Sequence, residues 1–181
     1  MSNGTILFLN GTSSSGKTSL SNELLRLLDG EQYMYLSVDH AISGMNEMLI
    51  HMYGPQLSEA EVNKIEAEEW IESSVISLFH HTILAFSMIG KNIIVDHVLV
   101  DLAWLEECQQ LLSNSKIFYI GVHCPLEELE RREMNRGDRP IGLARAQFNK
   151  VHQKCEYNLE VNTYSHSIAE CAAAIKEFIE S

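Results

Sequence analysis

A single motif near the N-terminus constrains the fold of this chain more than any other feature. Residues 11–18 read Gly-Thr-Ser-Ser-Ser-Gly-Lys-Thr, the G-x-x-x-x-G-K-[ST] pattern of a phosphate-binding loop. An apolar run at residues 6–9 precedes the loop, and an amphipathic run at residues 19–28 follows it. Strand, glycine-containing loop and helix form the order that such a loop requires. The motif therefore predicts an α/β protein whose ligand carries phosphate.

The residue types within the loop predict separate tasks. Gly11 and Gly16 let the backbone curl so that its N–H groups point toward phosphate oxygens, and the following helix adds the positive end of its dipole. Lys17 is expected to reach the β- and γ-phosphates, and the hydroxyl of Thr18 to ligate Mg²⁺. The alternative is a Gly/Ser-rich turn without a ligand. The residues expected to bind phosphate are Gly11, Thr12, Ser13, Ser14, Ser15, Gly16, Lys17, Thr18 and Ser19.

Length, composition and charge narrow the class of protein. A chain of 181 residues with 45% hydrophobic residues is expected to form one soluble domain over 1–181. The net charge of −12 argues against a nucleic-acid partner, and the lack of an 18-residue apolar run argues against a membrane partner. The N-terminus lacks the basic region of a signal peptide, and the four cysteines show no C-x-x-C spacing. We therefore expect a cytoplasmic protein with free thiols; a homo-oligomer remains open.

The hydrophobic periodicity alternates between strand and helix along the whole chain. This alternation predicts a parallel sheet of five strands covered on both faces. Together with the phosphate loop, it indicates a three-layer fold like that of P-loop nucleotide kinases. Strands are expected at residues 5–10, 33–38, 91–96, 116–122 and 159–161. Helices are expected at 17–28, 42–52, 58–88 with room for one break, 101–112, 126–133, around 147–152, and 167–179.

Two aspartates follow predicted strands. Asp39 comes after the strand at 33–38, and Asp96 ends the strand at 91–96. Ligands of parallel α/β sheets bind at the carboxyl ends of the strands, so both carboxylates are expected beside the phosphate loop. Asp96 is expected to hold Mg²⁺ together with Thr18, the alternative being an N-cap or turn aspartate. Asp39 is expected to act as the base that accepts a proton from an incoming hydroxyl, the alternative being a cap for a helix that starts at Ala41.

The arginines are concentrated in one segment. Five of the six lie in the segment 131–145, which contains Arg131, Arg132, Arg136, Arg139 and Arg145. Guanidinium groups suit phosphate, and the glycine between Arg136 and Arg139 suggests a lid over 131–145. We expect Arg136 and Arg139 to contact the transferred phosphoryl group as catalytic residues, alongside Lys17 and Asp39. The alternative is a helix with a solvated basic face.

Two further patterns are interpreted as structural. His80 and His81 are adjacent, so on a helix they point to different faces and cannot chelate one metal together; no zinc site is expected. The methionines at 45, 48 and 52 recur at helical spacing, which is typical of a core, although a helix leaving Asp39 would also pass an acceptor pocket.

These motifs together resemble the chloramphenicol phosphotransferases. The loop, the Ser37-Val38-Asp39 strand end and the strand 93–96 are similar to that family's phosphate loop, base-bearing strand end and third strand. The closest similarity lies in the C-terminal third, at residues 121–124, 136–139, 156–157, 160–161 and 168–172. The chain differs from the family pattern at His97, Asn158 and Asn162, where acidic residues are typical.

The resemblance implies ATP-dependent, Mg²⁺-dependent phosphorylation of a hydroxyl on a small molecule, with an antibiotic alcohol as the type substrate and Asp39 as the base. A nucleotide or other metabolite kinase of the same architecture is the nearest alternative, and a non-catalytic nucleotide-binding protein is another. A GTPase switch is disfavoured, because its Asn-Lys-x-Asp guanine motif is missing: residues 149–152 read Asn-Lys-Val-His.

Overall fold

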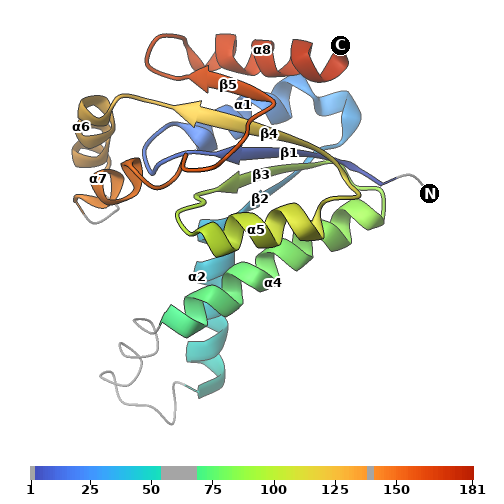
Figure 1. Ribbon diagram of the computed structural model, residues 1–181, viewed down its shortest axis with the longest axis vertical. Helices are drawn as coiled ribbons and strands as arrows, with labels where there is room; N and C mark the ends of the chain where they lie inside the picture. The colour runs from blue at the N-terminus through green and yellow to red at the C-terminus, as the bar shows by residue number, and fades with distance from the viewer. Residues whose placement is uncertain (1–2, 54–68, 138–140) are drawn as a thin grey trace.

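The computed structural model describes residues 3–53, 69–137 and 141–181, and within this part of the chain five parallel strands form one sheet (Figure 1). The strand order is β2-β3-β1-β4-β5. The strands are β1 (Thr5–Asn10), β2 (Met34–Ser37), β3 (Ile93–His97), β4 (Lys116–His123) and β5 (Leu159–Asn162). The predicted α/β fold with a five-stranded parallel sheet is confirmed.

Helices connect successive strands, and one more helix follows the last strand. They are α1 (Lys17–Leu27), α2 (Val38–Tyr53), α4 (Glu69–Met88), α5 (Leu102–Leu111), α6 (Leu126–Arg136), α7 (Leu143–Phe148) and α8 (Ile168–Glu180), with a short 3₁₀ helix at Asp29–Glu31. No helix in the described ranges is long and apolar enough to cross a membrane.

The central strand β1 divides the core into two halves. Its residues Ile6 and Phe8 pack into one apolar cluster and Leu7 and Leu9 into the other, because successive side chains of a strand point to opposite faces. Helices α4 and α5 cover the first cluster, and α1 and α8 cover the second (Figure 1). All four of these β1 side chains are fully buried, so the strand is an unbroken apolar run rather than an alternating one.

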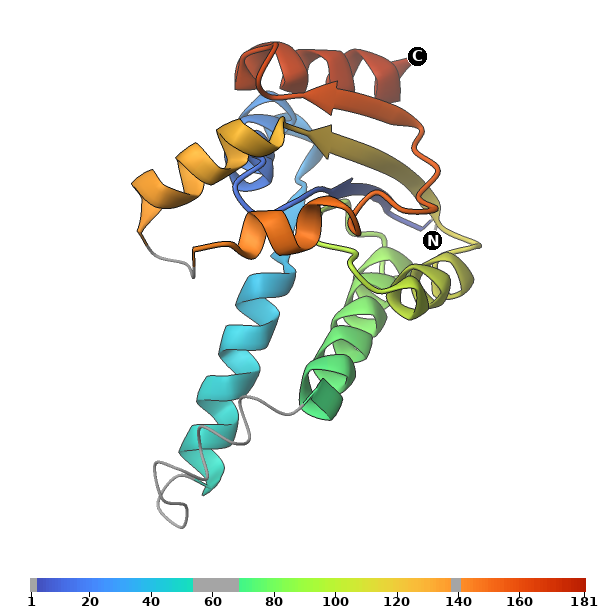
Figure 2. The same ribbon diagram turned by 60° about the vertical axis from the view of Figure 1, so that its left-hand side comes forward.

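Helices α2 and α4 pack against each other and extend beyond the edge of the sheet (Figure 2). The carboxyl ends of the strands point toward α6 and α7, which lie together at that end of the sheet (Figure 1). The loop between β1 and α1 therefore lies at the carboxyl end of the central strand, at the same end of the sheet as α6 and α7.

Most predicted element boundaries agree with the structure to within a few residues, and two differ in ways that affect the site. Helix α2 begins at Val38, directly after β2, which is earlier than the predicted start at residue 42. Asp39 therefore lies in the first helical turn, and the alternative that it caps a helix starting at Ala41 does not hold. Helix α6 continues to Arg136, where Gly137 ends it with a φ of 68°. The predicted capping box at 58–61 lies outside the described residues.

Candidate active site

The phosphate loop forms the floor of a cleft of about 520 Å³ at the carboxyl end of the sheet. Elements from the whole chain contribute to its walls. The lining residues are Ser13, Ser14, Gly16, Lys17, Thr18 and Ser19 of the loop and α1, Asp39 of α2, Asp96 and Val98 at the end of β3, Arg132 and Arg136 of α6, and Thr163, His166, Ser167 and Ile168 between β5 and α8. The predicted convergence of the loop with Asp39 and Asp96 is therefore seen.

The loop backbone has the curled shape that a phosphate cradle needs. Gly16, the N-cap of α1, has a φ of 94°, and Ser14 has a φ of 63°, both in the left-handed region. A Cβ on Gly11 would lie 2.5 Å from the Val122 carbonyl oxygen, so a larger residue would not fit there. The buried hydroxyls of Ser13, Ser14 and Ser15 have no hydrogen-bond partner in the part of the chain that the structure describes. Unpartnered hydroxyls and first-turn N–H groups are donors that suit phosphate oxygens.

Lys17 lies almost fully buried beneath the loop. Its Nζ donates hydrogen bonds to the carbonyl oxygens of Gly11 (2.8 Å) and Thr12 (3.0 Å). It also lies 3.7 Å from Oδ1 of Asp96. The ammonium group is therefore held within the cleft by the loop itself.

Thr18 and Asp96 bring a hydroxyl and a carboxylate together in the cleft. The Thr18 hydroxyl donates to Asp96 Oδ2 over 2.9 Å, and the Tyr35 hydroxyl of β2 donates to the same oxygen over 3.0 Å. Burial and the nearby carboxylate raise the pKa of Tyr35, so its hydroxyl stays protonated and donates. A carboxylate beside a hydroxyl is the donor set that Mg²⁺ prefers. Sequence reasoning missed Tyr35, although its place two residues before the end of β2 is a usable signal.

The arginine cluster is divided between the cleft and the surface. Arg132 and Arg136 are four residues apart and share the face of α6 that lines the cleft. Arg131 pairs with Glu128 and Arg145 with Glu130 on the exposed side, so the alternative of a solvated basic face holds for these two. Arg139 lies outside the described residues.

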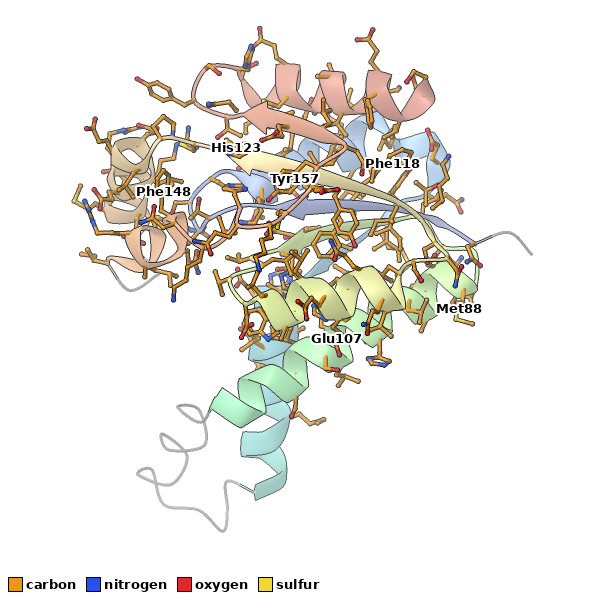
Figure 3. All side chains as sticks on the ribbon, in the orientation of Figure 1. Met88, Glu107, Phe118, His123, Phe148 and Tyr157 are labelled. Atoms are coloured by element: carbon orange, nitrogen blue, oxygen red, sulfur yellow. The ribbon has the colours of Figure 1, made fainter. Side chains whose placement is uncertain are left out.

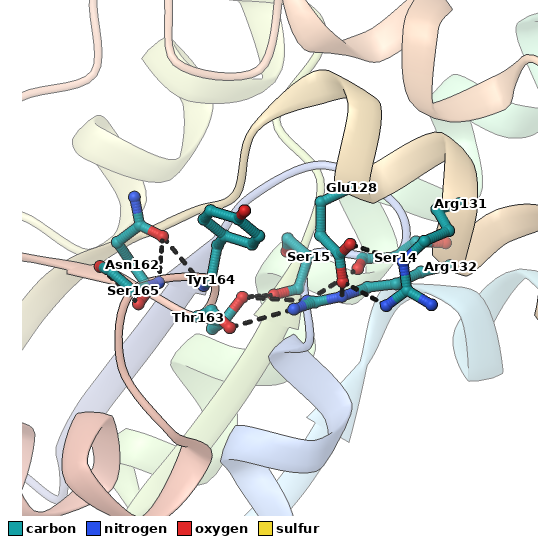
Figure 4. Close-up of polar contacts among 9 residues, drawn as sticks. All are labelled: Ser14, Ser15, Glu128, Arg131, Arg132, Asn162, Thr163, Tyr164 and Ser165. Carbon is teal, nitrogen blue, oxygen red and sulfur yellow. Dashed lines mark hydrogen bonds and ion pairs between the residues drawn. The ribbon is translucent and has the colours of Figure 1, made fainter.

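Arg132 braces the phosphate loop, a role that the sequence did not indicate (Figure 4). Its guanidinium group donates to the carbonyl oxygen of Thr163 over 3.0 Å and to the Thr163 hydroxyl over 3.1 Å, and it reaches the Ser14 carbonyl at 3.5 Å. The Thr163 hydroxyl in turn donates to the Ser15 carbonyl over 2.6 Å. Hydrogen bonds from Arg131 and Arg132 lower the pKa of Glu128 to about 2, so this carboxylate stays charged and orients Arg132.

The start of the loop is anchored from behind by Asn10. Its side-chain amide donates to the Val151 carbonyl (2.7 Å) and the Tyr157 hydroxyl (2.8 Å), and its Oδ1 accepts from the N–H of Leu99 (2.8 Å). Tyr157 lies over the end of β4 near His123 (Figure 3). Behind it, the His152 ring lies 2.7 Å from the Tyr157 hydroxyl. Three segments that are distant in sequence therefore meet at one buried amide.

His97 occupies a position where the chloramphenicol phosphotransferases, which this chain resembles, typically have a second acidic residue. It is the first member of a series of polar contacts that runs through His80 to Glu107. Its Nδ1 accepts the Val98 N–H (2.8 Å), and its Nε2 lies 3.0 Å from Nε2 of His80. His80 Nδ1 contacts Glu107 (labelled in Figure 3). Burial lowers the pKa of both histidines, that of His97 strongly, so both rings stay neutral. His81 is exposed, which confirms that the two adjacent histidines diverge, and among the described residues no group of three or more His, Cys, Asp or Glu side chains could hold a metal ion.

Several solved structures with similar folds are kinases. The APS kinase CysC of Mycobacterium tuberculosis, in complex with AMPPNP and APS, superposes with a TM-score of 0.70 at 19% identity, covering 100% of both chains. A gluconokinase from Sinorhizobium meliloti 1021 superposes with a TM-score of 0.65 at 14% identity, covering 98% of this chain and 93% of that one. At these identities the similarity establishes the fold.

Comparison of sequences identifies the family. A protein of Mycobacterium tuberculosis strain H37Rv named "Putative O-phosphotransferase Rv2636" is 28% identical over 187 residues, which cover 98% of this chain and 83% of that protein. The family model for chloramphenicol phosphotransferase-like proteins matches residues 4–180, the whole span that contains the cleft. The chain therefore belongs to the chloramphenicol phosphotransferase-like family, and it is a kinase-type enzyme that transfers phosphate.

Proposed function

We propose that this enzyme transfers the terminal phosphoryl group of ATP to a hydroxyl group of a small molecule. The observation that carries the proposal is that the Asp39 carboxylate lines the same cleft as Lys17 and the Thr18–Asp96 pair. A proton acceptor beside a phosphate cradle is what phosphorylation of an alcohol requires, because the attacking hydroxyl must lose its proton.

The residues present fit a nucleotide and its metal. The loop residues 11–19 would hold the phosphates through backbone N–H groups, serine hydroxyls and Lys17, while Thr18 and Asp96 would hold Mg²⁺. The bound metal would supply charge neutralisation at the transferred phosphoryl group. Tyr35 keeps the Asp96 carboxylate oriented through its hydrogen bond.

Asp39 is proposed to accept the proton of the acceptor hydroxyl and to hold that oxygen in line. It lies in the first turn of α2 and lines the same cleft as the phosphate loop. A carboxylate in this role contributes about 10²–10⁴-fold to the rate.

Arg136 and Arg139 are proposed to bind the phosphoryl group from the other side of the cleft. Arg136 lines the cleft at the last turn of α6, directly before Gly137. The segment 131–145 would act as the lid that excludes water from the acceptor site.

The acceptor is proposed to enter on the side of Asp39 and Val98, beside α2 and α4. Chloramphenicol is the first candidate because of the family to which the chain belongs, and an antibiotic-resistance role would follow from it. Another metabolite is the second candidate, because the similar folds include an APS kinase and a gluconokinase. We place the enzyme in the cytoplasm, since its four cysteines are free thiols.

The decisive experiment is a screen for acceptor-dependent ATP consumption. The purified chain would be incubated with MgATP and chloramphenicol, other hydroxylated antibiotics, nucleosides, nucleoside monophosphates, adenylyl sulfate and gluconate, and each hit examined by mass spectrometry for one added phosphate. Lys17→Ala should abolish turnover with every acceptor. Turnover retained by Lys17→Ala would overturn the assignment of the loop.

A further inference from the structure

The phosphate loop is held by a side chain from outside the predicted site, Gln147 of α7. Its Oε1 accepts the backbone N–H of Ser13 over 2.8 Å. The two residues are 134 positions apart in the sequence, so the contact belongs to the tertiary fold rather than to the loop motif. Ser13 directly precedes Ser14, whose left-handed φ of 63° is uncommon for a residue with a Cβ.

Three successive loop residues are held by three different elements. Gln147 of α7 binds the Ser13 N–H, Arg132 of α6 reaches the Ser14 carbonyl, and Thr163 after β5 binds the Ser15 carbonyl. A serine loop lacks the conformational freedom of glycine, and external partners can hold a backbone that its own sequence does not prefer. Arg132 also donates a hydrogen bond to the Thr163 hydroxyl, so these two residues hold the loop together. Gln147 holds the loop separately, from α7.

Helix α7 is itself held firmly at both ends. The carboxylate of Glu133, which is 2% exposed, accepts the N–H groups of Gly142 (2.7 Å) and Ala144 (2.8 Å) and so fixes the start of the helix to α6. After the helix, the Val151 carbonyl accepts from Asn10 at the end of β1. The backbone that carries Gln147 is thus tied to α6 on one side and to the base of the phosphate loop on the other.

From this arrangement we infer that Gln147 is a positioning residue, which keeps the phosphate loop in its binding-competent shape and makes α7 a structural part of the cradle. The consequence for nucleotide affinity rests on the proposed function, whereas the consequence for loop order does not. A preorganised cradle binds its ligand more tightly because the ordering cost is already met in the free protein.

Two measurements on the full chain test the inference. Gln147→Met keeps the length of the side chain and removes the acceptor. It should speed amide exchange in the peptide spanning residues 10–16 of the nucleotide-free protein and weaken MgATP binding in calorimetry, each by roughly tenfold. Gln147→Glu keeps an acceptor oxygen and should leave the exchange rate near that of the wild type. Gln153→Met is the matched control, because Gln153 is exposed and donates to Asn149 instead of the loop.

These measurements distinguish a positioning role of Gln147 from a role as a ligand and from a failure of the proposed function. Unchanged exchange in Gln147→Met, or equally fast exchange in Gln147→Glu, would overturn the positioning role. Weaker MgATP binding without faster exchange would also overturn it, because the side chain would then act as a ligand. If the wild-type chain fails to bind MgATP, the proposed function fails, and the exchange measurement still decides the role of Gln147.

Discussion

The Thr18 hydroxyl donates a 2.9 Å hydrogen bond to Oδ2 of Asp96, which joins the first turn of α1 to the end of β3 at one carboxylate. Tyr35 donates to the same oxygen and Lys17 lies near the other, so this single group receives contacts from two elements, α1 and β2. Its charge is what a divalent cation at this position would need.

Replacing Asp96 by Asn should therefore impair the enzyme through its metal. We expect kcat/KM to fall by at least about a hundredfold, because metal stabilisation of a phosphoryl group contributes several kcal/mol. The Mg²⁺ concentration that gives half-maximal rate should rise, and chelation of Mg²⁺ should abolish wild-type activity. Asp101→Asn is the control, since Asp101 caps α5 on the surface and Asn caps equally well. An Asp96→Asn variant with a wild-type response to Mg²⁺ would remove Asp96 from the metal site.

Replacing Asp39 by Asn should affect the chemical step. With an acceptor identified by the screen, kcat should fall by about 10²–10⁴-fold, because the hydroxyl proton loses its acceptor. The affinity for MgATP should change little. Asp29→Asn, in the exposed 3₁₀ helix, should behave as the wild type. Equal losses of MgATP affinity and kcat would instead make Asp39 a metal ligand.

Replacing Gly121 by Ala should destabilise the fold. A Cβ at this position would lie 2.8 Å from Cδ2 of Tyr157, within the network that anchors Asn10. Overpacking of this kind costs about 1–3 kcal/mol, which urea denaturation would detect as a lower midpoint at unchanged slope. Gly30→Ala is the matched control, since nothing lies within 4 Å of its added Cβ. Equal stability of the two variants would contradict the close packing of Gly121.

Mild acid should destabilise the protein through its buried histidines. Burial, with the neighbouring His123 and Lys17, lowers the pKa of His152 to about 4, against about 6.5 in an unfolded chain. Between these two pH values the unfolded chain binds a proton at His152 more readily than the folded chain does. The free energy of unfolding is therefore unaffected by this residue above about pH 6.5, and it decreases as the pH falls toward 4. Urea denaturation at pH 7.5, 6.5, 5.5 and 4.5 measures this decrease.

His152→Gln should flatten that pH dependence while keeping an amide partner for Tyr157. The remaining slope would come from His80 and His97, whose pKa values are also lowered. A variant as acid-sensitive as the wild type would show that His152 does not contribute.

Much of this architecture follows from local patterns in the sequence. The apolar run before Gly11 predicts β1, and the general rule for parallel sheets predicts that Asp39 and Asp96 meet at one end of it. Periodicity cannot reveal which arginine of a helix faces the loop, since that depends on how α6 packs. Arg132 was therefore not singled out, and the clamp predicted for Arg139 stays a prediction.

The contacts that the sequence could not supply are those between distant segments. Gln147 and Ser13, or Tyr35 and Asp96, become neighbours only when separate strands and helices assemble. The start of α2 was misplaced for a related reason: β2 runs into the helix without a turn residue between them, so no sequence signal marks the boundary.

The strand order β2-β3-β1-β4-β5 has a consequence for how such enzymes diversify. The parts that grip the nucleotide in our proposal come from the middle of the sheet and from the side of β4 and β5, whereas Asp39 and the helix α2 belong to the opposite edge. Mutations at that edge can alter which alcohol is accepted while leaving the residues that would bind the triphosphate unchanged. A change of substrate would then require changes at only one edge of the sheet, while the nucleotide-binding part of the cleft stays the same.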